Sequence, residues 1–327
     1  MRAAVITQPG DADVLVVQDV EDPSCGPEDV LVAVRATALN RADLLQRRGR
    51  YPSPRGTRSD IPGLEMAGVV EAVGERVGDW APGDRVMALL AGAGYAEKVA
   101  VHERQLMAIP ENLDFEQAAS IPEAFLTAYD AMFRQCGLEM GESVLVHAAG
   151  SGVGTAAIQL AAAASCRVFG TAGSPEKLEQ ARALGLDVGI NYRTEDFAEA
   201  IARETGGRGV DVILDVIGGP YWAQNLAALA AQGRMVIVGT MGGATVEANL
   251  GALMGKRLRV YGTVLRARPI EQKAQLTQEF AQRVLPLFAR GIVRPVVDRV
   301  FALDEVAEAH RLMESNANFG KIVLRVG

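Results

Sequence analysis

A glycine-rich turn joins two apolar segments near the middle of the chain. Residues 147–154 read HAAGSGVG, between the run SVLV and the alanine-rich run TAAIQLAAAA. A strand followed by such a turn and a helix presents backbone N–H groups and the positive end of a helix dipole to an anion. The side chains of Gly150, Ser151, Gly152 and Gly154 are small enough to let a phosphate approach. We therefore predict that this turn binds the pyrophosphate of a dinucleotide.

The sequence of the turn departs from the usual glycine pattern of dinucleotide-binding turns. Gly152 to Ala157 fit GxGxxA, but Ala149, Ser151 and Gly154 are the more natural occupants of the three glycine positions. A tight strand-to-helix turn that binds no ligand has the same pattern. The turn alone leaves both interpretations open.

The next strand indicates which dinucleotide is bound. In NAD sites this strand ends in an acid that bonds the ribose diol. Here RVFGTAG (167–173) is followed by Ser174, Pro175, Glu176 and Lys177, so no carboxylate is expected at the strand tip. Ser174, Lys177 and Tyr192 are donors for a 2′-phosphate, and two such contacts favour NADPH over NADH on the order of 100-fold. Alternatively, Ser174 is only a helix N-cap and Lys177 a solvated helix residue.

Repeating patterns around the turn predict the fold that positions it. The first third has short Val- and Ala-rich runs separated by Gly and Pro, which indicates a barrel-like β unit. From residue 143 to 265, apolar strands alternate with helices, which predicts a doubly wound parallel sheet. A long helix over 271–288 follows, and then a strand–helix–strand tail that we expect to rejoin the first domain. The cleft between the two domains is the expected site. The predicted strands are 143–149, 167–173, 210–218, 234–240 and 258–265.

Composition excludes several classes of function. The net charge of −7 disfavours binding to nucleic acid or anionic membranes. No apolar run approaches the roughly 20 residues of a membrane span, and the N-terminus does not resemble a signal peptide. The three cysteines are far apart and no CxxC occurs, so neither a disulfide framework nor a structural zinc is expected. We interpret the chain as a reduced, cytoplasmic protein.

Several stretches together identify a family. They are ALNRADLLQRRGRYPSP (38–54), PGLEMAGVVEAVG (62–74), HAAGSGVGTAAIQLA (147–161), TAGSPEKLEQARALG (171–185), VILDVIGGPYW (212–222) and EAHRLMESNANFGKIVL (308–324). In these stretches the chain resembles the zinc-free, zeta-crystallin-like quinone oxidoreductases of the medium-chain dehydrogenase/reductase superfamily, and within them the tumour-suppressor-induced branch. The resemblance implies an α/β fold with a GroES-like β-barrel-type catalytic domain (1–123 and 267–327) and a Rossmann domain (124–266). It also implies a homodimer, joined through the sheet edge formed by 258–265.

The resemblance sharpens the question of a metal. Zinc-dependent members of the superfamily have a catalytic Cys near the NRAD segment (40–43) and a His–Glu pair in a GHE motif. In this chain the second motif reads Gly63-Leu64-Glu65, and the cysteine is absent. Zinc requires three or four N, S or O ligands, so we expect a zinc-free site. For Glu65 we favour a structural hydrogen bond over catalysis.

The resemblance also assigns site residues. Asn40 and Tyr51 are the expected catalytic residues beside the nicotinamide, where Tyr51 stacks on a flat acceptor or bonds its oxygen. The alternatives are a turn residue at Asn40 and a loop tyrosine at Tyr51. The expected cofactor contacts are Thr127, Ser151, Gly152, Val153, Thr171, Ser174, Lys177, Tyr192, Gly239, Thr240, Met241, Leu265, Arg266, Asn318 and Lys321.

These observations lead to one functional hypothesis and two rivals. The hypothesis is hydride transfer from NADPH to a quinone, with the proton supplied by solvent or a tyrosine. The first rival is an NADPH-dependent enone double-bond reductase on the same fold. The second is a non-catalytic NADPH- or RNA-binding protein of crystallin type, although the chain has no RNA module. We interpret the basic residues Arg47, Arg48, Arg50, Arg55 and Arg58 as a solvated loop, and His310 as half-exposed.

Overall fold

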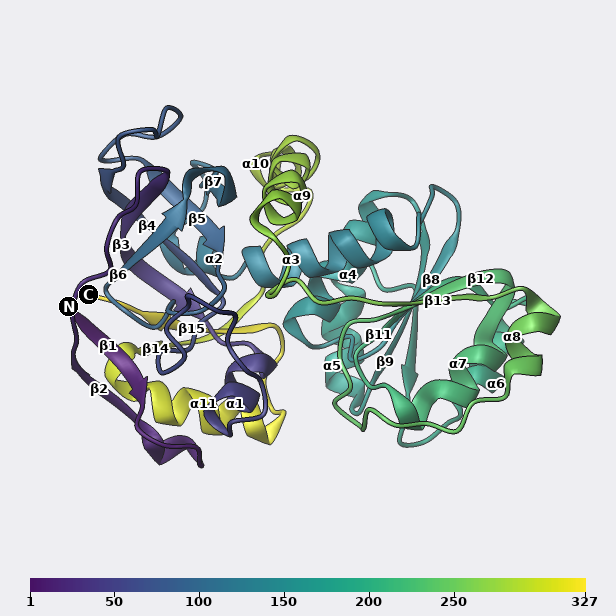
Figure 1. Cartoon of the computed structure of the whole chain (residues 1–327). Helices are drawn as coiled ribbons and strands as arrows, with labels where there is room; N and C mark the ends of the chain where they lie inside the picture. Colours follow the sequence, from purple (N-terminus) through teal and green to yellow (C-terminus); the bar gives the residue numbers. More distant parts are fainter. The chain divides into compact units, whose positions relative to one another are not determined.

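The computed structural model describes all residues from Met1 to Gly327, which form two compact units. Unit 1 consists of Met1–Leu126 and Leu265–Gly327, and unit 2 of Thr127–Val264. The expected α/β class, with a parallel Rossmann-like sheet and a GroES-like part, is confirmed. Figure 1 shows both units, with the chain coloured from the N-terminus to the C-terminus.

Unit 2 is built on a six-stranded parallel sheet in the order β10-β9-β8-β11-β12-β13. This is the strand order of a dinucleotide-binding fold, in which ligands bind beyond the carboxyl ends of the strands where the order reverses. The order reverses between β8 and β11, and the glycine-rich turn follows β8. The strands are β8 (Ser143–Val146), β9 (Arg167–Ala172), β10 (Val188–Asn191), β11 (Val210–Asp215), β12 (Leu229–Ile237) and β13 (Arg259–Gly262).

Helices cover both faces of this sheet (Figure 1), and the strand side chains on both faces are therefore buried. Leu145, Phe169 and Ile213 lie in one buried cluster with Phe197 of α6 and Leu226 of α7. The helical elements of the unit are η3, a π-helix (Asp130–Gln135), α4 (Gly152–Ala163), α5 (Pro175–Arg182), α6 (Phe197–Glu204), η4 (Gly219–Tyr221), α7 (Trp222–Ala228) and α8 (Leu250–Lys256); α3 (Pro122–Tyr129) leads into it.

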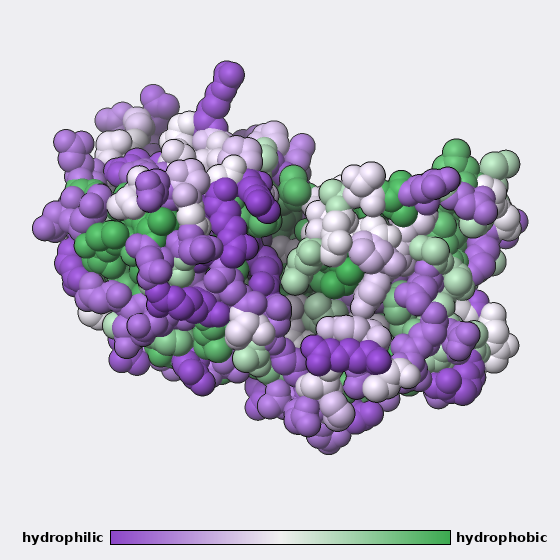
Figure 2. Space-filling view, turned by 90° about the horizontal axis from the view of Figure 1, so that it is seen from below, coloured by the Kyte–Doolittle hydropathy of each residue, from purple (hydrophilic) through white to green (hydrophobic).

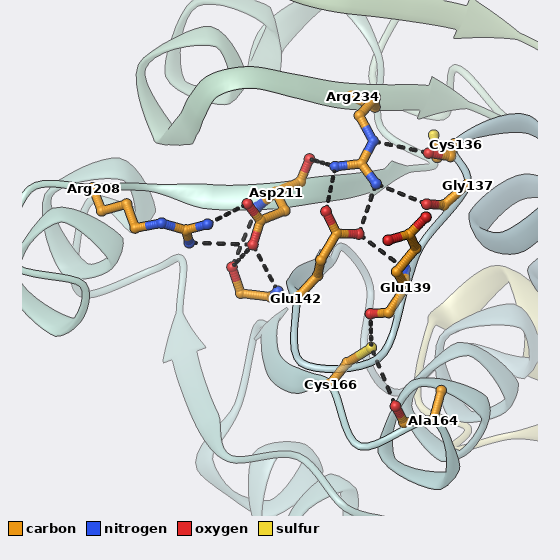
Figure 3. Close-up of polar contacts among 10 residues, drawn as sticks. Cys136, Gly137, Glu139, Glu142, Ala164, Cys166, Arg208, Asp211 and Arg234 are labelled. Atoms are coloured by element: carbon orange, nitrogen blue, oxygen red, sulfur yellow. Dashed lines mark hydrogen bonds and ion pairs between the residues drawn. The ribbon is translucent and has the colours of Figure 1, made fainter.

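A network of charges ties β12 to the loop before β8 (Figure 3). The Arg234 guanidinium donates to both carboxylate oxygens of Glu142, at 2.8 and 2.7 Å, and to the carbonyls of Cys136 and Gly137. The Asp211 carboxylate accepts the backbone N–H of Ser143 at 2.9 Å and also binds Arg208. Each charge in this network therefore has a partner of opposite sign.

Unit 1 has a seven-stranded sheet and a separate hairpin-like pair, β1 with β2. The sheet order is β14-β15-β3-β4-β5-β7, and β6 also pairs with β3. The strand β15 pairs with β3 in antiparallel orientation, so the C-terminal tail is part of the N-terminal sheet. The strands are β1 (Arg2–Ile6), β2 (Leu15–Asp19), β3 (Asp29–Ala38), β4 (Glu65–Val73), β5 (Arg85–Leu89), β6 (Lys98–His102), β7 (Leu106–Ala108), β14 (Val297–Ala302) and β15 (Lys321–Arg325).

In the core of unit 1, alternate side chains of β3 pack together with side chains of α11 and β15. Val30, Val32 and Val34 of β3 are buried in the same cluster as Ala309 of α11 and Ile322 of β15. Burying apolar side chains from both ends of the chain fixes the tail on this sheet. The helical elements are η1 (Ala12–Val14), α1 (Arg41–Arg47), η2 (Glu103–Gln105), α2 (Phe115–Ala119), α9 (Ile270–Arg283), α10 (Leu285–Ala289), η5 (Leu303–Glu305) and α11 (Val306–Ser315).

The structure corrects two interpretations of polar residues. Arg47, expected in a solvated loop, is fully buried at the end of α1, where it donates to the Gly10 carbonyl and contacts His310 Nδ1 at 3.1 Å. His310, expected to be half-exposed, is buried, and burial lowers its pKa to about 3. Glu314 of α11 pairs with Arg47 and balances its charge. These residues hold α11 against α1.

Hydrophilic residues cover much of the face shown in Figure 2, with hydrophobic residues in separate smaller groups. No helix combines the length and the apolar character needed to cross a lipid bilayer. The strand β13 lies at the edge of its sheet, as the sequence predicted. Exposed apolar side chains precede and follow it, at Leu250, Met254 and Val264.

Candidate active site

The turn after β8 has the geometry of an anion-binding helix start. Ser151 is the N-cap of α4, and its hydroxyl oxygen accepts the Gly154 N–H at 2.9 Å. The next amides, from Gly152 and Val153, are among those that an α-helix leaves without an internal carbonyl partner. A Cβ at Gly154 would lie 2.3 Å from the Ala148 carbonyl oxygen, so only glycine permits this close approach. The turn fits a pyrophosphate.

The end of β9 gathers donors beside the start of α5. Ser174 is the N-cap of α5, and its hydroxyl oxygen accepts the Lys177 N–H at 3.4 Å. A Cβ at Gly173 would lie 2.6 Å from Tyr192 Oη and 3.1 Å from Arg193 Nε, so these two side chains lie over the strand tip. Sequence reasoning named Tyr192 but missed the adjacent Arg193, whose position in the same NYR segment was the available signal.

A carboxylate lies in the first turn of the helix that follows the strand tip. Glu176, in the first turn of α5, bonds the Ser174 hydroxyl and a backbone N–H, which holds the pKa of its carboxyl below the usual range. The strand β9 itself ends at Ala172 without a carboxylate, and Glu176 belongs to the helix that follows. The helix brings Glu176 back toward its N-cap, because an acid in the first turn is stabilised by the helix dipole. The Ser174 hydroxyl is shared between this carboxylate and any ligand.

A buried polar chain lies beneath the carboxyl edge of the sheet. His147 contacts the Thr171 hydroxyl at 2.9 Å and Asn225 Oδ1 at 2.7 Å. Asn225 in turn donates to Asp215, whose carboxylate also accepts the Ile217 and Gly218 N–H groups. Burial lowers the pKa of His147 to about 4, so this imidazole is neutral at physiological pH. The Thr171 hydroxyl, predicted as a cofactor contact, binds His147 in the structure.

The other predicted cofactor contacts are divided between the units. Gly239, Thr240 and Met241 follow β12, at the same carboxyl edge as the α4 and α5 starts, because all these strands are parallel. Thr127 is partly exposed in α3. Leu265 is buried in unit 1, and Asn318, also in unit 1, donates to the Gly320 carbonyl at 2.8 Å.

In unit 1, Asn40 lies in a buried polar cluster. It is the N-cap of α1, and its Nδ2 donates to Glu65 Oε1 at 2.8 Å. Lys321 Nζ lies 2.6 Å from Glu65 and donates at 2.7 Å to both Asn40 Oδ1 and the Leu39 carbonyl. All three Lys321 donors are thus occupied within unit 1. In the structure Lys321 holds Asn40 and Glu65, and its contact with a cofactor stays a prediction.

Asp43 lies beside this cluster and is fully buried. Its carboxylate accepts the backbone N–H groups of Asn40 (2.8 Å) and Gly63 (3.1 Å) and the Tyr95 hydroxyl (3.0 Å). Burial nevertheless raises the pKa of Asp43 to about 6. These bonds fix the start of α1, and with it the orientation of Asn40.

The Tyr51 ring is held by Arg266. The guanidinium lies 4.9 Å from the ring centroid and donates to Gln46, Ser53 and the Ala91 carbonyl. Arg266 therefore holds the Tyr51 loop, and its contact with a cofactor stays a prediction. Burial raises the pKa of the Tyr51 phenol, with a smaller contribution from Glu123. A cavity of about 330 Å³ adjoins the ring and is lined also by Gln46 and Ser53.

Glu123, which sequence reasoning missed, completes the cluster. It lies in the first turn of α3, where its backbone N–H donates to Glu65 Oε2 at 2.8 Å. Burial, and then the nearby Glu65 carboxylate, raise the pKa of the Glu123 carboxyl to about 8. The acid directly after Pro122 was the available signal, but only the fold brings it to Glu65.

The segment Gly63-Leu64-Glu65 offers few ligands for a metal. Leu64 is buried and supplies no ligand, and Glu65 is bonded to Asn40 and Lys321. No group of three or more His, Cys, Asp or Glu side chains with the geometry of a metal site occurs in the chain.

Comparison with known proteins agrees with this architecture. Residues 26–111 match the alcohol dehydrogenase GroES-like domain, and residues 152–289 match the family described as zinc-binding dehydrogenase. The chain is 35% identical to the quinone oxidoreductase of Lama guanicoe, over 99% of this chain and 97% of that protein.

Solved structures with different activities share the fold. An NAD-dependent alcohol dehydrogenase is 36% identical (TM-score 0.88, 100% of both chains), and the CurK enoyl reductase is 31% identical (TM-score 0.89, 100% of this chain and 99% of that chain). The Escherichia coli quinone oxidoreductase, solved in complex with NADPH, is 30% identical (TM-score 0.87, 99% of this chain and 100% of that chain). The match to quinone oxidoreductases over nearly the whole length decides the family: the chain belongs to the quinone oxidoreductases of the medium-chain dehydrogenase/reductase superfamily.

Proposed function

We propose that this protein is a zinc-independent, NADPH-dependent reductase of quinones. The observation that carries the proposal is the combination of a pyrophosphate-type turn at Ser151–Val153 with an Asn40–Glu65–Lys321 cluster at the position of a zinc site. Bound NADPH supplies the hydride. The protein then has to position an acceptor and manage a proton, and a quinone is electrophilic enough to accept a hydride without a Lewis acid.

The residues of unit 2 bind the cofactor in this proposal. The amides of Gly152 and Val153 bind the pyrophosphate, and the loop Gly239–Met241 lies along the same edge of the sheet. Ser174, Tyr192 and Arg193 bind the 2′-phosphate, with Lys177 beside them. Arg193 adds a positive charge at the strand tip. It offsets Glu176, which opposes a 2′-phosphate, so we expect NADPH to be preferred over NADH.

The residues of unit 1 bind the acceptor. Tyr51, held by Arg266, offers an aromatic face for a planar quinone. The Asn40 side chain is fixed by Glu65 and Lys321, which gives it one orientation. In the proposed function, Asn40 positions the nicotinamide ring relative to the quinone.

A second candidate activity is reduction of a conjugated enone double bond. The CurK enoyl reductase shares the whole fold, and the same cofactor edge serves both reactions. The residues that bind the acceptor decide between the two reactions. In quinone reduction the hydride goes to a carbonyl group, and in enone reduction it goes to the β-carbon.

We also propose that two copies associate through β13. The edge of the unit 2 sheet has unpaired backbone groups, and exposed apolar side chains at Leu250, Met254 and Val264 lie on the segments flanking this strand. Light scattering of the purified protein measures the mass directly. A monomer at micromolar concentration would contradict this assignment.

The function is tested by fluorescence titration with NADPH and NADH, followed by NADPH oxidation with ortho- and para-quinones and one enone. We expect tighter binding of NADPH and turnover of quinones. Enone turnover without quinone turnover would favour the second candidate. Binding without turnover of any acceptor would support a non-catalytic protein.

A further inference from the structure

Three carboxyl groups lie close together in unit 1, but only one is left without a donor. Glu65 receives Asn40 Nδ2, Lys321 Nζ and the Glu123 N–H. Asp43 receives two backbone N–H groups and the Tyr95 hydroxyl. The Glu123 carboxyl has no hydrogen bond or ion pair to the protein, although its own backbone is fixed on Glu65.

The charged groups around Glu123 do not compensate it. Two carboxylates, Glu65 of β4 and Asp43 of α1, oppose its ionisation, while Lys321 of β15 and Arg266 favour it. Both cations are already committed: Lys321 to Glu65 and Asn40, and Arg266 to the Tyr51 loop. Tyr51, the remaining titratable neighbour, also interacts with Glu123. A carboxyl in such surroundings keeps its proton near neutral pH.

The position of Glu123 suits proton delivery as well as storage. The residue is partly exposed, unlike Glu65 and Asp43. Its backbone N–H donates to Glu65, which also binds Asn40, the residue expected beside the nicotinamide. Besides burial, Glu123 also raises the pKa of the Tyr51 phenol, whose ring receives the acceptor in the proposed function. Glu123 therefore belongs to the cluster that lies on the acceptor side of unit 1 in the proposed function.

We propose that the Glu123 carboxyl is the acid that protonates the acceptor oxygen during reduction. This inference rests on the proposed function. The quinone gains a hydride from NADPH, which becomes NADP⁺, and a proton from Glu123. The O–H bond of the carboxyl breaks as an O–H bond forms on the acceptor, giving the hydroquinone. The Glu123 carboxylate then regains a proton from water.

The test compares Glu123→Gln with Tyr51→Phe across pH. The glutamine has the same size, and the backbone N–H bond to Glu65 does not depend on the side chain. For the wild type we expect kcat/KM with a quinone to fall as the pH rises through about 8, because only the protonated carboxyl donates. Glu123→Gln should lose about 10²-fold in kcat and lose this pH dependence, with NADPH affinity unchanged. Glu111→Gln, on an exposed turn, is the matched control.

The outcomes separate this inference from the function itself. Wild-type rate and pH profile in Glu123→Gln, with both lost in Tyr51→Phe, would assign the proton to the tyrosine and overturn the proposal. Absence of quinone turnover in the wild type would instead contradict the proposed function. In that case infrared difference spectroscopy still decides: a protonated carboxyl band at pH 7 that disappears in Glu123→Gln supports the held proton, and its absence from the wild type overturns it.

Discussion

Two charged clusters of this molecule differ in how completely their charges are paired. Around Arg234 in unit 2, the Glu142 and Asp211 carboxylates each face a guanidinium, and the remaining Arg234 donors go to backbone carbonyls (Figure 3). Around Glu65 in unit 1, three carboxyl groups share one lysine, and Glu123 receives no donor. A cluster whose charges are all paired holds strands and loops together. A carboxyl group without a partner keeps a titratable proton that can be transferred in a reaction.

The thiols beside the first cluster fit its structural role. Burial raises the pKa of Cys136 to about 12 and that of Cys166 to about 11. At such values almost no thiolate forms at neutral pH, so both cysteines are unreactive. The Arg234 cluster therefore has no group that is poised for catalysis.

The largest effect is expected from Lys321→Met, which breaks the one cation–carboxylate pair of the unit 1 cluster. Glu65 would remain as a buried, unpaired charge, which costs about 4 kcal/mol of unfolding free energy. Urea unfolding measures this loss. Adding Glu65→Gln should restore much of the loss, and failure to do so would contradict the pairing.

Arg234→Ala should have the next largest effect. It leaves Glu142 unpaired and the Cys136 and Gly137 carbonyls without their donor, which costs about 3 kcal/mol. Arg283→Ala removes an exposed helix pair with Glu279 and should cost less than about 0.5 kcal/mol. NADPH affinity should change little in folded Arg234→Ala protein. A large loss of affinity would show that this cluster has more than a structural role.

The cofactor edge of unit 2 offers a smaller version of the same contrast, with Arg193 opposed by Glu176. Arg193→Ala should weaken NADPH binding about 10-fold and leave NADH binding unchanged, because the guanidinium bonds only the 2′-phosphate. Glu176→Gln should tighten NADPH binding by a few-fold. Fluorescence titration of both cofactors checks these ratios. Equal effects on NADPH and NADH would exclude a 2′-phosphate role.

The smallest effect concerns the pH dependence of stability. The pKa of Glu123 is raised from 4.5 to about 8 in the folded protein, so the folded state binds the proton more tightly than the unfolded state. Stability is therefore greater below pH 4.5 and decreases as the pH rises through about 8. Glu123→Gln should lose less stability than the wild type between pH 6.5 and 8.5. Asp43 contributes little in this window, because its pKa is about 6. Parallel curves for the two proteins would contradict the raised pKa.

The sequence by itself determined the α/β class, the parallel sheet around the 147–154 turn and the family. These features depend on patterns that act over a few residues: apolar runs of strand length, the Ser151 N-cap, and the glycine needed at position 154 beside Ala148. Short-range capping and periodicity are visible in one window of sequence. The fold class and the turn were therefore predictable, although the short strands β2, β7 and β10 were not identified.

Only the tertiary structure decided which charged residues are free and which are committed. Lys321 and Asn40 are 281 residues apart, and Arg47 and His310 are 263 apart, yet both pairs are in contact. The same fold places Glu176 against Ser174, Thr171 on His147, and Glu123 beside Glu65. No local pattern specifies such pairs, because burial and long-range partners, rather than residue type, decide whether a side chain stabilises the fold or remains available to a ligand.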